Sequence, residues 1–118
     1  MRGMKTRSTV VAQDKVIAEF LSMVSPLTGH IREMYLFGSR CRDDWRPDSD
    51  YDVLVVLDRR DRSIIDGLYD AVMDVLLAEG RLISLKIFSE SEFAFLKSME
   101  TPFVRNVLKE GVKIGSDS

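Results

Sequence analysis

The chain has 118 residues and a formal net charge of −2, from 17 basic and 19 acidic side chains. Its composition, 45% hydrophobic and 31% charged, is that of an ordinary folded protein, which excludes disordered, collagen-like and repeat chains. The acidic balance argues against direct nucleic-acid binding. With one cysteine and one histidine, an internal disulfide and a Cys/His zinc site are excluded.

We expect a single domain over residues 1–118, with frayed ends at 1–8 and 115–118. No apolar run is long enough for a membrane helix, so no membrane association is expected. The basic start of the chain is not followed by the apolar stretch of a signal peptide, which predicts a cytoplasmic protein.

The first half of the chain predicts a helix and two strands. Apolar residues at helical spacing predict a helix that is capped by Ser8 or Thr9 and runs to about Val24. A strand follows over 31–37, and a second strand is predicted over 51–58. The second strand is apolar at nearly every position, which is typical of a central strand buried on both faces.

The second half predicts the remaining elements from caps and turn residues. In chain order they are a helix from Ser63 to about Gly80, a strand over 82–88, a helix capped by Ser89 or Ser91, a helix from Thr101 to Gly111, and a short strand over 112–114. Helices that alternate with strands in this way predict an α/β domain, strictly α+β, in which helices pack on a small mixed sheet.

Two short motifs carry the chemistry. Asp50 and Asp52 are two residues apart at the start of a strand, so their side chains face the same side, where Mg²⁺ favours carboxylate oxygens. Gly38-Ser39 ends the preceding strand, where backbone N–H groups can hold phosphate. Taken alone, each motif also fits a solvated strand start or a tight turn. The combined pattern Gly-Ser-x₁₀-Asp-x-Asp arises by chance about once in a hundred to two hundred such chains, and this predicts one site.

The segment Tyr35-Leu-Phe-Gly-Ser-Arg40, together with Arg46-Pro-Asp-Ser-Asp-Tyr-Asp-Val-Leu-Val-Val-Leu-Asp58, resembles the minimal nucleotidyltransferases (MNT domains) of the DNA polymerase β superfamily. The segment 101–112 is similar to the closing helix of those domains. The spacing between the motifs is similar to that of the MNT antitoxins of HEPN–MNT toxin–antitoxin pairs, some of which transfer AMP from ATP to a tyrosine of the toxin. The resemblance implies a minimal polymerase-β-like nucleotidyltransferase fold, with a short mixed sheet and helices packed mainly on one face.

The resemblance also implies a role for each site residue. The expected site consists of Gly38, Ser39, Arg40, Arg42, Asp50 and Asp52. The Gly-Ser pair would hold the β and γ phosphates of a nucleoside triphosphate, and the two aspartates would be catalytic and bind Mg²⁺. The two arginines would either contact the triphosphate or pair with neighbouring aspartates on the surface.

One departure from the family pattern weakens the expectation of catalysis. Catalytic members carry a third carboxylate on the strand that corresponds to residues 82–88, and here Ser84 or Lys86 stands at that place. A third carboxylate normally serves a metal or takes the proton of the attacking hydroxyl. The alternative function is therefore a weakly active or inactive module that binds nucleotide and a partner.

The expected partner is a second chain that supplies the acceptor pocket, because 118 residues leave little beyond the catalytic platform. The resemblance favours a helical HEPN-type protein, and a homodimer is the simpler possibility. The resemblance implies that the acceptor is a hydroxyl of a protein or of a small molecule. An antibiotic-modifying transferase fits less well, because no additional domain encloses such a substrate. The sequence does not distinguish ATP from other nucleoside triphosphates or one metal ion from two.

Overall fold

The structure is a computed structural model that describes residues 14–37 and 51–115. In these residues the central feature is a four-stranded sheet with the order β3-β2-β1-β4. Its strands are β1 (Ile31–Phe37), β2 (Tyr51–Leu57), β3 (Ile83–Ser89) and β4 (Val112–Lys113). Strand β1 is antiparallel to both β2 and β4, whereas β2 and β3 are parallel. The predicted mixed sheet is confirmed.

Strand β2 is central in the sheet and is buried on both faces. The side chains of Val53 to Leu57 are each at most 1% exposed. They alternate between two apolar clusters: Val53, Val55 and Leu57 belong to one cluster, and Leu54 and Val56 belong to the other. The continuous apolar run in the sequence therefore reflects a strand that is covered on both sides, as predicted.

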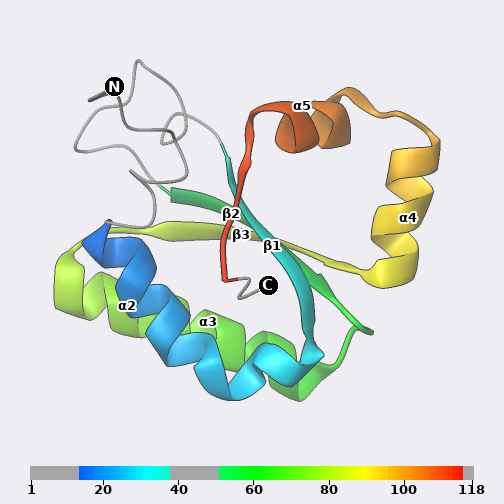
Figure 1. Ribbon diagram of the computed structural model, residues 1–118. Coiled ribbons are helices and arrows are strands. Elements are labelled where there is room, and N and C mark those ends of the chain that lie inside the picture. The colour runs from blue at the N-terminus through cyan, green and yellow to red at the C-terminus, as the bar shows by residue number, and fades with distance from the viewer. Residues whose placement is uncertain (1–13, 38–50, 116–118) are drawn as a thin grey trace, which may run out of the picture.

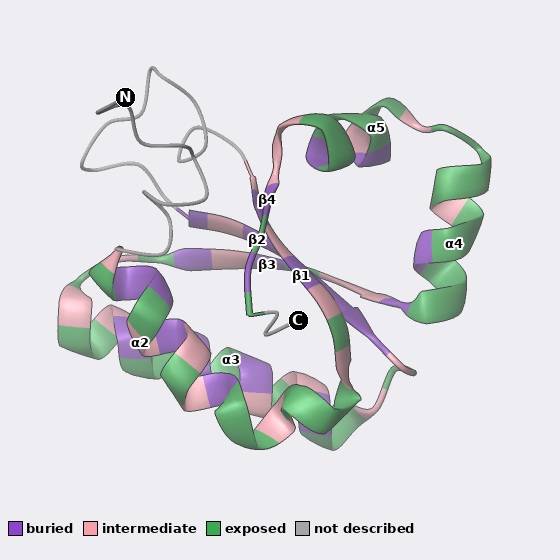
Figure 2. Ribbon diagram, viewed as in Figure 1, coloured by how far each residue is buried: buried purple, intermediate pink, exposed green. Residues whose placement is uncertain are grey.

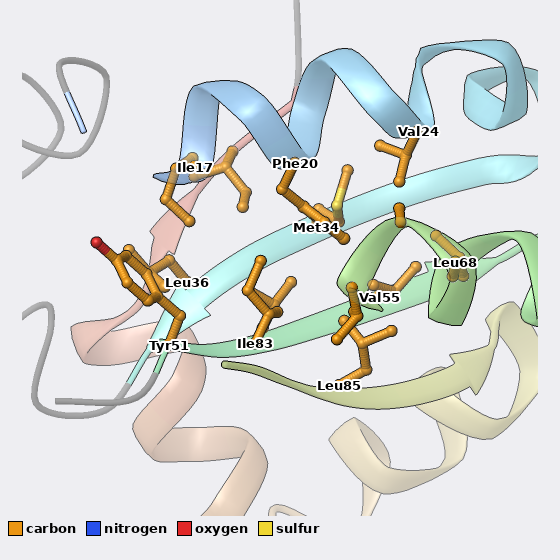
Figure 3. Close-up of a cluster of buried hydrophobic side chains, with 14 of the residues drawn as sticks. Ile17, Phe20, Val24, Met34, Leu36, Tyr51, Val55, Leu68, Ile83 and Leu85 are labelled. Atoms are coloured by element: carbon orange, nitrogen blue, oxygen red, sulfur yellow. The ribbon is translucent and has the colours of Figure 1, made fainter. Parts of the chain in front are cut away.

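Two long helices cover the first face of the sheet: α2 (Lys15–Val24) and α3 (Arg62–Glu79). Figure 3 shows their side chains, among them Phe20 and Leu68, meeting those of Val55 and Leu85 from the sheet. Phe20 and Leu68 are both 0% exposed. Burying such large apolar side chains stabilises the fold by about 1.5–3 kcal/mol each.

The start of α2 corrects the sequence prediction. We expected a cap at Ser8 or Thr9, which lie outside the described residues, but the helix that ends at Val24 begins at Lys15. Asp14 has an extended backbone, with φ −75° and ψ 123°, and its side chain accepts hydrogen bonds from the N–H groups of the first turn. Asp14 is therefore the N-cap of α2. A short 3₁₀ helix, η1 (Ser25–His30), follows α2 and was not predicted.

The other helix boundaries agree closely with the prediction. Asp61, two residues before the predicted first residue Ser63, caps α3. Gly80 ends the helix with a φ of +70°, a left-handed conformation that favours glycine. The helix α4 (Glu90–Ser98) is capped by Ser89, one of the two predicted caps. The helix α5 (Pro102–Glu110) is capped by Thr101 and is followed by Gly111, as predicted.

Helices α4 and α5 pack on the second face of the sheet, opposite α2 and α3 (Figures 1 and 2). Their buried residues Phe93, Val104 and Val107 cluster with Leu54 and Val56 of β2. We expected helices mainly on one face of the sheet. The longer helices α2 and α3 cover the first face, and the shorter helices α4 and α5 form a second layer on the other face. None of the helices in the described residues is both long enough and apolar enough to cross a membrane. The expected frayed ends fall mostly on residues 1–8 and 116–118, which the structure does not describe.

Candidate active site

Of the six predicted site residues, Asp52 is the one within the described part of the chain. The others, Gly38, Ser39, Arg40, Arg42 and Asp50, lie outside it, and their roles stay predictions. The residues next to this segment do constrain it, because Phe37 of β1 is the register partner of Asp52 of β2. The last residue of β1 and the first residues of β2 therefore lie at the same end of the sheet.

Asp52 lies on the sheet face that α4 and α5 cover. It alternates with Val53, and it shares its face with Leu54 and Val56 of the second apolar cluster. Whereas Leu54 and Val56 are at most 1% exposed, Asp52 is half-buried. This sheet face therefore changes from apolar to polar towards the start of β2, where Asp52 is partly exposed.

The position beside Asp52 on β3 is occupied by Ser84. The two residues are register partners in the parallel β2–β3 pair, and Lys86 is the partner of Leu54. Ser84 and Lys86 therefore share the face of Asp52, Ser84 being half-buried and Lys86 exposed. No aspartate or glutamate occurs on β3, so this strand provides no further carboxylate beside Asp52.

The donors present fit a magnesium ion in chemical type. Mg²⁺ is commonly held by one or two carboxylates together with water and substrate phosphates. Asp52 provides one half-exposed carboxylate, and Ser84 lies next to it in register. Within residues 14–37 and 51–115, no cluster of three or more His, Cys, Asp or Glu residues gathers to form a complete metal site. A metal at Asp52 would thus need ligands from Asp50 and from a bound phosphate.

Tyr51 fixes the start of β2 from the opposite face. It is 2% exposed, and its hydroxyl lies 2.8 Å from both carboxylate oxygens of Asp14, to which it donates a hydrogen bond. Asp14 in turn caps α2, so one carboxylate joins the first turn of that helix to the residue before Asp52. Figure 3 shows the Tyr51 ring at the edge of the core beside Leu36. Sequence reasoning missed this link, although an aspartate ahead of an apolar helical pattern is a cap signal.

Aromatic side chains cluster on the same sheet face as Asp52. Phe37, its register partner, meets the ring of Phe103 of α5 edge-on at a centroid distance of 5.6 Å. The ring of Phe88 lies 6.4 Å from those of both Phe103 and Phe93. These contacts are within the range of favourable aromatic pairs. Asp52 on β2 thus lies between its two register partners, Phe37 of β1, which belongs to this aromatic cluster, and Ser84 of β3.

The hydroxyl of Tyr35, on the same face, hydrogen-bonds to Glu33. Burial raises the pKa of Tyr35, and the hydrogen bond to the Glu33 carboxylate and its negative charge raise it further. Tyr35 therefore keeps its proton at neutral pH and acts as a hydrogen-bond donor within the aromatic cluster.

Comparison with known proteins identifies the family. Residues 15–118 match the family model described as "Polymerase beta, Nucleotidyltransferase". The chain therefore belongs to the polymerase β nucleotidyltransferase family, which confirms the predicted minimal nucleotidyltransferase domain and its fold.

Two individual proteins are similar to this chain. A protein of Methanocaldococcus jannaschii that carries the provisional name protein adenylyltransferase is 37% identical over 100 residues, which are 84% of this chain and 94% of the relative. A crystal structure of a provisionally named nucleotidyltransferase from Sulfolobus solfataricus aligns with a TM-score of 0.49 and 20% identity. That alignment covers 96% of this chain and 90% of the other.

Proposed function

We propose that this chain transfers a nucleoside monophosphate, AMP from ATP, to a hydroxyl group, with Mg²⁺ held by Asp50 and Asp52. One observation carries the proposal: in a chain of the nucleotidyltransferase family, Asp52 lies at the polar, accessible end of a sheet face, directly beside the strand end that leads into Gly38-Ser39. The phosphate-binding pair and the carboxylates would therefore meet at one sheet edge.

In the proposed reaction the acceptor hydroxyl attacks the α-phosphorus in line with the leaving pyrophosphate. A new P–O bond forms, the bond to the β-phosphate oxygen breaks, and the hydroxyl proton passes to a carboxylate or to water. Gly38 and Ser39 would bind the β and γ phosphates, with Arg40 and Arg42 nearby as candidate contacts. When bound, Mg²⁺ would neutralise the charge that develops on the phosphate oxygens.

A second candidate function is a module that binds nucleotide and a partner without efficient turnover. The register of β2 and β3 favours it, because Ser84, whose hydroxyl is a poor base, stands beside Asp52 where catalytic members have a carboxylate. Asp50, Asp52 and the phosphate-binding pair would suffice for binding. Transfer would then be slow or would depend on a group from the partner.

The proposed acceptor is a protein. The name of the Methanocaldococcus jannaschii relative describes a protein adenylyltransferase, and this chain covers 94% of that relative's length. A helical HEPN-type toxin, for which this chain would be the antitoxin, is the proposed partner. A homodimer that modifies itself is the simpler arrangement.

The test is transfer of label from α-³²P-ATP, with Mg²⁺, to a purified HEPN-type partner and to the chain itself. The variant Asp50→Asn/Asp52→Asn should abolish labelling. Asp58→Asn, a matched change just beyond the other end of β2, should leave it intact. Nucleotide binding without labelling would favour the binding module. Absence of both binding and labelling would overturn both functions.

A further inference from the structure

The outward side of α3 carries an exposed apolar row. Tyr69, Met73 and Leu77 are 48%, 52% and 80% exposed. They are four residues apart along the helix, so they lie one above the other on a single side. The sheet-facing residues of the same helix, such as Leu68 and Val75, are 0% exposed. Figure 2 shows exposed residues recurring along α3.

An acidic row runs beside the apolar one. Asp66, Asp70 and Asp74 are exposed, and each precedes a member of the apolar row by three residues. The Nε atom of Arg62 lies 4.0 Å from Oδ2 of Asp66. In the described part of the chain, no cation comes within ion-pair distance of Asp70 or Asp74. We refer to these six aspartate and apolar residues together as the outer face of α3.

The outer face is unfavourable for a helix that stays exposed to water. Like charges four residues apart repel each other along the helix. Exposed apolar side chains add to this cost. A partner with apolar side chains between basic ones would relieve both the charge repulsion and the exposure of apolar side chains.

We propose that the outer face of α3 is a docking surface for a protein that presents an apolar strip flanked by lysine or arginine side chains. Charge complementarity excludes a second copy of α3 as the occupant, because two such faces would bring six aspartates together. The surface lies on the face of the sheet opposite Asp52, so an occupant leaves the Asp52 side open. The inference therefore does not depend on the proposed catalytic function.

The experiment measures binding of the full chain to a labelled helical peptide with leucine at every fourth position and flanking lysines. A twin peptide with glutamate in place of lysine is the control probe. Asp70→Lys/Asp74→Lys should weaken binding of the lysine peptide by about tenfold, and Leu77→Ser should also weaken it. Glu90→Lys/Glu100→Lys, an equal change of charge on the α4 side, should change binding less than about twofold.

Three results would overturn the proposal. Equal weakening by the α3 and α4 charge variants would show non-specific attraction. A dimer of the wild-type chain that Leu77→Lys dissociates in light scattering would assign the surface to a second copy. Peptide binding that appears only after removal of residues 1–13 would assign it to that segment. Thermal unfolding checks that these exposed substitutions leave the fold unchanged.

Discussion

Replacing Tyr51 by phenylalanine tests how the start of β2 is held. The change removes the hydroxyl that lies 2.8 Å from both oxygens of Asp14, and it keeps the ring that packs in the core. Asp14 remains free to cap α2 through its other hydrogen bonds. The variant therefore isolates one hydrogen bond to a charged group beside the candidate metal ligand.

The expected loss of stability is about 1.5 kcal/mol. Hydrogen bonds to charged groups contribute about 1.5–3 kcal/mol, and the half-buried position of Asp14 places this bond at the lower end, because water can replace the lost donor. No cavity term is added, since the phenyl ring fills the same volume. For a chain of this length the loss corresponds to a decrease of about 5 °C in melting temperature.

Urea unfolding followed by circular dichroism measures the change, with Tyr69→Phe as the matched control on an exposed tyrosine, for which we expect no change. In an Asp14→Ala background, Tyr51→Phe should cost less than it does in the wild type, because the carboxylate that accepts this hydrogen bond is already gone. Equal stability of Tyr51→Phe and Tyr69→Phe, or an undiminished cost in the Asp14→Ala background, would refute the reasoning.

Three further predictions concern α4 and the site. Ser89→Ala removes the capping box of α4 and should lower the free energy of unfolding by about 1 kcal/mol in urea unfolding; no change would contradict the cap. The Ser89 N–H donates a hydrogen bond to the Glu92 carboxylate, and this bond, together with the positive charge of Arg60, lowers the pKa of Glu92 below 4.5. The ionised carboxylate therefore stabilises the fold fully above pH 4.5, and this stabilisation is lost as the pH falls further. The stability difference between wild type and Glu92→Gln should therefore shrink between pH 6 and pH 3, and a constant difference would contradict it. Ser84→Asp places a carboxylate beside Asp52 and should strengthen Mg²⁺ binding in calorimetry by about tenfold or more, whereas unchanged binding would argue against a metal at Asp52.

Local signals predicted the elements well. The apolar run of β2 and the Thr101-Pro102 start of α5 with Gly111 at its end placed those boundaries because caps, prolines and glycines act within a few residues. The predicted start of α2 was wrong because Ser8, Thr9 and Asp14 are all acceptable caps by residue type. Asp14 is further engaged by Tyr51, a partner 37 residues away, and no local pattern reveals such a contact.

In the candidate site, too, the sequence predicted what depends on neighbouring residues and not what depends on contacts between distant segments. The alternation of a strand predicted that Asp50 and Asp52 share a face, but not which face, nor that α4 and α5 cover it. The sequence left Ser84 and Lys86 as alternatives for the place of the third carboxylate. The pairing of β2 with β3, two strands that α3 separates in the chain, puts Ser84 beside Asp52.

The most direct test of the central claim is calorimetric titration of ATP into the full chain, with and without Mg²⁺, alongside Asp50→Asn/Asp52→Asn. We predict binding in the micromolar range that requires Mg²⁺ and that the double variant loses. The absence of binding of ATP or of any other nucleoside triphosphate, or binding that is equal in the double variant, would contradict a nucleotide site at these carboxylates.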